Sequence, residues 1–234
     1  MIPVVVNRDR RLLAVLLALT FVTGIVDAVS YLGLGHVFTA NMTGNVVLLG
    51  FAVAGASGLS VARSLVSLVA FLAGALGAGR LSVLTLNTPR GRWLVTAGAV
   101  EAGLLLGAAA VSTGSDAPTD TPSSPVYAVI ALTAAAMGFR TMTARQLAVL
   151  DMTTTVLTQT LAAVAGESSL AGGRNPRAGR RLAAVVRMLA GAAVGTLLLR
   201  YGLALPLVVS SACVLGASMY AGASAHAEAG ATGR

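Results

Sequence analysis

Three groups of polar side chains interrupt strongly apolar stretches of this sequence. Within each group, spacings of three or four residues predict a shared helix face. The first two groups are Asp27, Ser30 and Tyr31, and then Asn41, Gly44 and Asn45, with Thr39 and Thr43 close by. The third group is Asp151, Thr155 and Gln159, with Thr154 and Thr158 beside them. Such groups either bind a small polar solute or ion, or bond across helices and fix their packing.

The two interpretations carry different weight at different residues. A carboxylate at mid-membrane costs about 2.5–3.5 kcal/mol on insertion scales, so Asp27 is expected to face protein or water and is a candidate carrier of a coupling proton. For Asn45 or Thr158 taken singly, packing is the simpler interpretation. A helix beginning near Asn41 would direct free backbone N–H groups and the positive end of its dipole toward an anionic group.

Composition places these polar groups in a membrane. The 234 residues are 56% hydrophobic and 10% charged, whereas soluble domains carry about a quarter charged residues. Twenty-seven glycines are typical of membrane helices that pack closely through small residues. The sixteen basic residues, all arginine, gather in short clusters between apolar runs, as in topology-setting loops. We therefore expect membrane lipid, and no nucleic acid, among the partners.

Residues suited to catalysis or metal binding are scarce. Cys213 is the single cysteine, and His36 and His226 are too few and too far apart for a metal centre. The serine motif at 55–58 has no base placed to face it. We expect no enzyme activity, no cofactor and no metal.

Apolar runs measured against the ~20 residues of a membrane span give eight segments. They are 12–33, 36–57, 64–85, 93–113, 124–144, 148–165, 182–200 and 203–224. Eight full crossings from a cytoplasmic amino terminus would place the loop with Arg80, Arg90 and Arg92 outside, against the positive-inside rule. If segments 36–57 and 148–165 are broken or re-entrant, six crossings remain, and every arginine-rich loop and both termini are cytoplasmic. The sequence predicts an all-α polytopic membrane protein of this kind, in one domain over 1–234.

The two sides of the polar linker 114–123 resemble each other. Residues 71–75 match residues 188–192, and residues 41–46 match residues 151–156. Gly24 and Asp27 of the first half correspond in position to Gly138 and Thr141 of the second. Three crossings in each half invert the second half relative to the first, as in many secondary transporters. We therefore expect an inverted internal repeat with halves 12–113 and 124–224.

Two long motifs resemble a known family. Gly24-Ile25-Val26-Asp27-Ala28-Val29-Ser30-Tyr31-Leu32 and then residues 35–45 are similar to the first signature of the YoaK family of bacterial membrane proteins, a domain of unknown function. The second half fits the family's second signature at Gly138, Arg145, Leu147, Asp151, Thr154, Thr155, Val156, Leu157, Thr158, Thr160 and Leu161. The resemblance covers nearly the whole chain. It implies a cytoplasmic-membrane protein with about six helices and supplies no established activity.

The chain departs from the family in this second signature. Arg140 and Thr141 stand where the family has Gln-Asn, Met142 replaces a small residue and Gln159 replaces a glycine. Arg140 changes the charge of this half-site, and we expect it to pair with Asp27. Glu101, about nine residues into its apolar segment, is a candidate buried partner for an arginine.

The leading hypothesis is a small secondary transporter or permease for a small polar or anionic solute, in the bacterial cytoplasmic (inner) membrane. Its small size favours a homodimer. The alternative is a non-transporting scaffold or accessory subunit, whose polar groups are satisfied by neighbouring helices. The predicted binding residues are Asp27, Ser30, Tyr31, Asn41, Thr43, Asn45, Arg140, Asp151, Thr154, Thr155 and Thr158.

Overall fold

A computed structural model describes residues 3–85, 90–113, 124–146, 157–174 and 178–232, and regular structure there is entirely helical. Six of its helices are long and apolar enough to cross a membrane. They are α1 (Pro3–Gly33), α3 (Val61–Leu84), α4 (Arg90–Thr113), α5 (Ser124–Gln146), α7 (Ala178–Leu198) and α8 (Ala204–Thr232). The prediction of an all-α polytopic membrane protein with six crossings is confirmed.

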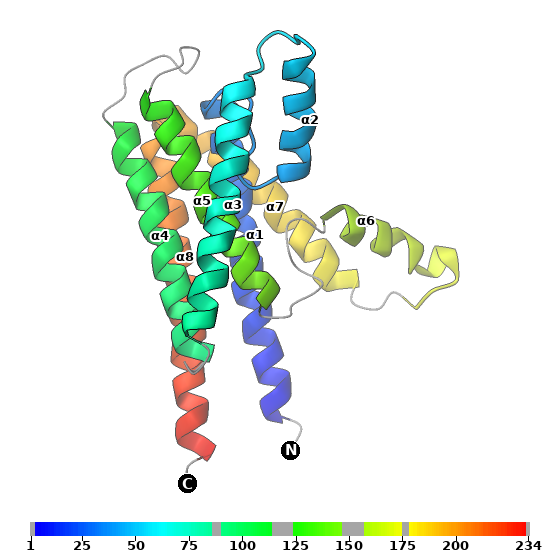
Figure 1. Cartoon of the computed structure of the whole chain (residues 1–234). Coiled ribbons are helices and arrows are strands. Elements are labelled where there is room, and N and C mark those ends of the chain that lie inside the picture. Colours follow the sequence, from blue (N-terminus) through cyan, green and yellow to red (C-terminus); the bar gives the residue numbers. More distant parts are fainter. Residues whose placement is uncertain (1–2, 86–89, 114–123, 147–156, 175–177, 233–234) are drawn as a thin grey trace.

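Successive crossings alternate in direction. The start of α1 and the end of α8 lie at the same end of the bundle, which we call the terminal end (Figure 1). From there α1, α4 and α7 run toward the opposite end, and α3, α5 and α8 return. The first crossing of the second half, α5, therefore runs against the first crossing of the first half, α1.

Three close helix pairs build the bundle: α1 packs along α7, α3 along α5 and α4 along α8. Two glycines explain how closely the first two pairs approach. A Cβ added at Gly24 would meet the backbone of Met188 and Ala192, and one added at Gly138 would meet the backbone of Phe71. Close approach through small residues is the usual way in which membrane helices associate.

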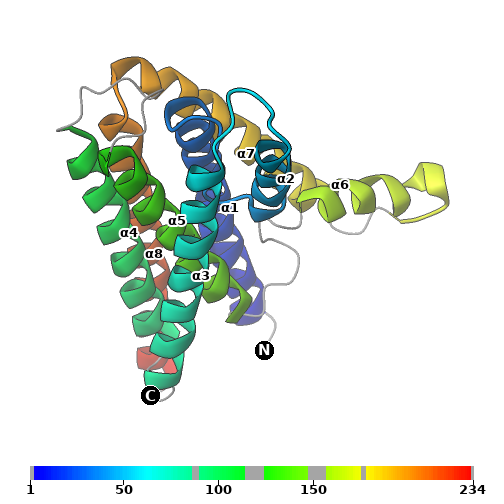
Figure 2. The same ribbon diagram turned by 45° about the horizontal axis from the view of Figure 1, so that its top comes forward.

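Two helices are too short to cross. α2 (Met42–Val53) has 12 residues and α6 (Leu157–Gly166) has 10, so at 1.5 Å per residue they span about 18 and 15 Å of a ~30 Å hydrocarbon core. α2 packs beside α3, whereas α6 contacts α7 and projects away from the bundle (Figures 1 and 2). Two 3₁₀ turns, η2 (Ser169–Ala171) and η3 (Leu199–Tyr201), complete the described elements. Among the described residues, segments 36–57 and 148–165 thus form short helices, as predicted.

Candidate functional site

The first turns of α2 and α6 line one cavity of about 310 Å³. Residues 42–44 come from α2 and residues 157–158 from α6, and α1 and α7 complete the lining. Four of the predicted binding residues meet there: Asp27, Asn41, Thr43 and Thr158. A volume of this size suits a small solute.

Local sequence fixes where α2 begins. The side chain of Asn41 caps the helix, because its Oδ1 accepts a hydrogen bond from the N–H of Gly44 at 3.3 Å. The N–H groups of Met42 and Thr43 belong to the first turn, so they have no acceptor within the helix. Met42 and Thr43 line the cavity, so the positive end of the helix dipole lies beside it. α6 likewise presents its first turn, from Leu157 onward, to the same space.

Asp27 brings a negative group to this cavity. Its Oδ1 is buried and has no hydrogen-bond partner among the described residues. The hydroxyl of Ser30 donates to the backbone oxygen of Asp27 at 3.2 Å and not to its carboxylate. The wall of the cavity therefore combines one carboxylate with the amino terminus of α2 and with Leu157 and Thr158 of α6.

The break between α1 and α2 is held by side chains. Gly35 and His36 have left-handed backbones with φ of 82° and 58°. Asn45, fully buried, accepts from the N–H of Phe38 at 3.3 Å and donates to the backbone oxygen of Ser64 at 3.4 Å. Ser67 donates to the backbone oxygen of Phe38 at 2.6 Å. Such bonds are what irregular backbone at membrane depth requires.

Three predicted binding residues therefore lie outside the lining of the cavity. Asn45 positions the break, and Ser30 bonds within its own helix. Tyr31 stacks on Phe38 with ring centroids 5.0 Å apart, so it packs against the same break. For these residues packing is the observed role.

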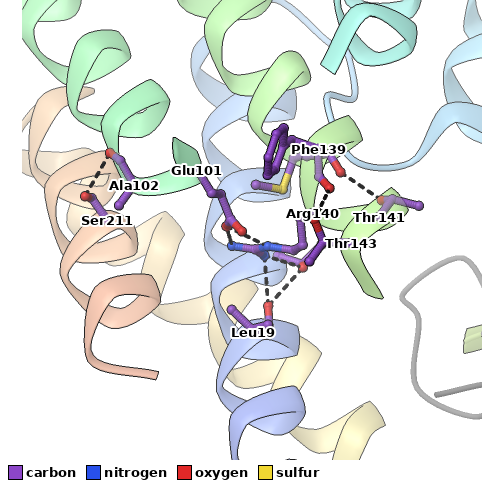
Figure 3. A network of polar contacts seen from close by, with 10 residues as sticks. Leu19, Glu101, Ala102, Phe139, Arg140, Thr141, Thr143 and Ser211 are labelled. Atoms are coloured by element: carbon purple, nitrogen blue, oxygen red, sulfur yellow. Dashed lines mark hydrogen bonds and ion pairs between the residues drawn. The ribbon is translucent and has the colours of Figure 1, made fainter. Parts of the chain in front are cut away.

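Arg140 pairs with Glu101, so the predicted pair between Arg140 and Asp27 is wrong for this conformation (Figure 3). The Nε of Arg140 lies 2.7 Å from Oε1 of Glu101, and Nη2 contacts the same oxygen. Nη1 donates to the backbone oxygen of Leu19 at 3.0 Å and to Oγ1 of Thr23 at 2.9 Å. Glu101 is thus the buried partner of an arginine, as expected. The two carboxylates lie on different helices, and sequence spacing does not show which of them Arg140 reaches.

The remaining predicted residues, Asp151, Thr154 and Thr155, lie outside the described residues. Thr23 was not among the predicted site residues, although it precedes Asp27 by one helical turn and shares its face. Over the described ranges, no three His, Cys, Asp or Glu side chains gather as they would around a metal ion.

Six apolar crossings with two short helices define a polytopic α-helical membrane protein. The family described as "Protein of unknown function (DUF1275)" matches residues 15–220, and the chain belongs to this family. The UPF0700 transmembrane protein YoaK of Bacillus subtilis (strain 168) is 39% identical over 155 residues, which are 66% of this chain and 65% of that relative. No solved structure matches the chain. The predicted resemblance to the YoaK family is confirmed.

Proposed function

We propose that this protein is a small secondary transporter or permease for a small polar or anionic solute and has no enzyme activity. One observation carries the proposal: the first turns of α2 and α6 meet at a cavity that also contains Asp27. Free N–H groups and the positive dipole end at the start of α2 favour an anionic group in this cavity, and Leu157 and Thr158 of α6 line the same cavity. Short helices that begin at the substrate near the middle of the membrane are a feature of many secondary transporters.

We also propose that the halves 12–113 and 124–224 form an inverted repeat. The matched positions make the same contact twice, because Gly24 meets the backbone of Met188 and Gly138 meets the backbone of Phe71. The pair of α1 with α7 corresponds to the pair of α5 with α3, and matched helices run in opposite directions. Two copies of one unit, related in this way, support exchange between an inward-open and an outward-open form.

The proposed location is the bacterial inner membrane, with the terminal end in the cytoplasm. Arg80, Arg92, Arg145 and Arg180 are exposed near that end of α3, α4, α5 and α7, and such an excess of basic residues marks the cytoplasmic side.

Thiol accessibility in sealed membrane vesicles tests the transporter. The single native thiol is first removed by Cys213→Ser, and Thr43→Cys or Thr158→Cys is then introduced. A charged, membrane-impermeant thiol reagent is applied from one side and then, in inverted vesicles, from the other. Alternating access predicts labelling of both positions from both sides. Val26→Cys, in the buried core, is the control that stays unlabelled.

Two outcomes contradict the proposal. If Thr43→Cys and Thr158→Cys are labelled from neither side, these positions are packed within the protein. That result favours a non-transporting scaffold or accessory subunit. Labelling from one side alone means a binding pocket without alternating access.

A further inference from the structure

The ion pair of Glu101 and Arg140 is a buried charged group that the proposed solute site does not use. Both residues are buried, at 4% and 8% exposure, within apolar crossings. A buried ion pair is weak support for stability, since the cost of desolvation offsets much of the attraction. The position of the Glu101–Arg140 pair between the helices, rather than its contribution to stability, indicates its role.

Helix direction orders the pair relative to the large cavity. Along α1, Asp27 and Thr23 line the cavity, and Leu19 follows one turn nearer the terminal end. Arg140 bonds to Leu19 (Figure 3) and to Thr23, which lines that cavity. Its guanidinium therefore lies against α1 at the terminal-end edge of the cavity.

A second, smaller cavity of about 40 Å³ lies on the other side of the pair. Glu101 and Arg140 line it, and the rest of its lining comes from the terminal-end parts of α1, α4, α5 and α8, such as Leu16, Thr143 and Ser218. It has room for water, which needs about 10–15 Å³ of such volume per molecule. The pair therefore stands between the large cavity and a small space that leads toward the terminal end.

The guanidinium of Arg140 ties three helices together at this point. It bonds through Nε and Nη2 to Glu101 of α4, and through Nη1 to Thr23 and Leu19 of α1, while its own backbone belongs to α5. One side chain thus links α1, α4 and α5 at the level between the two cavities.

Besides Glu101, Arg140 has a second carboxylate nearby with which it could pair, that of Asp27. Glu101 faces Arg140 from α4, and Arg140 contacts Thr23 of α1, which lies one helical turn from Asp27 on the same face. α8 carries no charged side chain over Ala204–Ala223. Two carboxylates thus compete for one guanidinium, and Oδ1 of Asp27 is the buried oxygen that has no hydrogen-bond partner among the described residues.

We propose that the Glu101–Arg140 pair is the barrier that closes the solute cavity toward the terminal end, and that it opens when Glu101 takes a proton and Arg140 turns to Asp27. This inference rests on the proposed transporter. In the step, a proton from solvent on the terminal-end side passes through water in the small cavity to a carboxylate oxygen of Glu101. Glu101 becomes neutral, and the water that carried the proton remains neutral water. Arg140 keeps its charge and exchanges the bond to Glu101 for one to the carboxylate of Asp27. The link between α4 and α5 is then released.

The test uses the full chain in sealed vesicles, with Cys213→Ser and Thr43→Cys, and the impermeant thiol reagent applied from the terminal-end side. The labelling rate is divided by that of a free thiol at the same pH, because protonation of the thiol itself slows the reagent. With Glu101 in place, this normalised labelling is slow near neutral pH and faster at acidic pH. Glu101→Gln mimics the protonated acid, so labelling is fast at both pH values. The expected increase near neutral pH is about tenfold, which corresponds to a shift of ~1.4 kcal/mol between closed and open forms. Glu101→Asp keeps the pH dependence.

Two comparisons separate a gate from a merely structural ion pair. Val26→Cys, in the buried core, reports whether the Glu101→Gln protein is folded, and it is expected to stay unlabelled. If Glu101→Gln is labelled from the terminal-end side as slowly as the parent, or retains the pH dependence, the proposal that this pair is a barrier is contradicted. The transporter proposal is not affected by that result. If the parent itself is labelled from neither side, the transporter fails, and this inference fails with it.

Discussion

Gly24 of α1 lies directly against Gly191 of α7: a Cβ on Gly191 would come within 3.2 Å of the Cα of Gly24. Gly138, matched to Gly24, makes the corresponding contact in the second half, because a Cβ on it would meet the backbone oxygen of Phe71 in α3, as one on Gly24 would meet that of Met188. At both crossings two helix backbones are separated by little more than their own van der Waals surfaces.

Gly24→Ala is therefore expected to destabilise the protein, because the added methyl group meets backbone atoms that cannot rotate away. Overpacking of this kind costs about 1–3 kcal/mol, so the Tm in detergent should fall by several degrees. The matched control is Gly77→Ala in α3, where an added Cβ meets no atom within 4 Å. That variant should keep the parent's Tm or exceed it, since alanine favours helix. Equal effects of the two substitutions would contradict the assigned packing.

Asn45→Ala should loosen the break between α1 and α2. It removes the acceptor for the N–H of Phe38 and the donor to Ser64, and an unsatisfied buried group costs about 1–3 kcal/mol. The measurement is thermal unfolding together with the rate of labelling of His36→Cys, an exposed position in the break. Thr43→Ala, whose side chain is exposed, is the control and should change the Tm little. An unchanged Tm for Asn45→Ala would show that the break holds without this side chain.

Removing one member of the Glu101–Arg140 pair should cost more than removing both. Glu101→Met leaves a buried guanidinium without its carboxylate, and breaking a buried pair costs about 3–5 kcal/mol. The double variant Glu101→Met with Arg140→Met leaves no charge and should recover much of that loss. Chemical denaturation of the four proteins in a double-mutant cycle gives the coupling. Additive losses would mean that the two side chains stabilise the bundle independently.

Asp27→Asn should abolish uptake if the cavity is the solute site. Small carboxylates and inorganic phosphate serve as probes, and their uptake into liposomes containing the purified protein is compared with the parent. A loss of tenfold or more, about 1.4 kcal/mol in the barrier, is expected for any probe that the parent transports. Ser30→Ala is the control, because that hydroxyl bonds within its own helix. Uptake that survives in Asp27→Asn removes this carboxylate from the mechanism.

The membrane orientation has its own test. In the Cys213→Ser background, Arg92→Cys near the start of α4 should react with an impermeant reagent only from the cytoplasm, since both it and the start of α1 lie at the terminal end. Ser57→Cys, exposed in the connection between α2 and α3, should react only from outside. The reverse pattern would invert the proposed topology.

The sequence predicted the architecture well because the signals for crossings are long and local. Apolar length separates α1 from α2, and arginine placement already favoured six crossings over eight. Asp27, Asn41, Thr43 and Thr158 were predicted to share a site, and they line one cavity.

Partner choice was harder to predict because it depends on rotations that sequence spacing does not contain. Ser30, Tyr31 and Asn45 share helix faces with cavity residues, yet their side chains are engaged by the backbone or by Phe38. Arg140 had two carboxylates to choose from, and the packing of α4 against α5 brings Glu101 to it.

The shortness of α2 also bears on how the chain is made. A twelve-residue apolar helix is too short to be retained in the bilayer as a span of its own, so α2 depends on tertiary contacts. Its buried amide at Asn45 donates to Ser64, which belongs to the next crossing and is synthesised later. α2 therefore gains this contact only when α3 is in place, and the cavity is complete only when α6 and α7, which also line it, have joined the bundle.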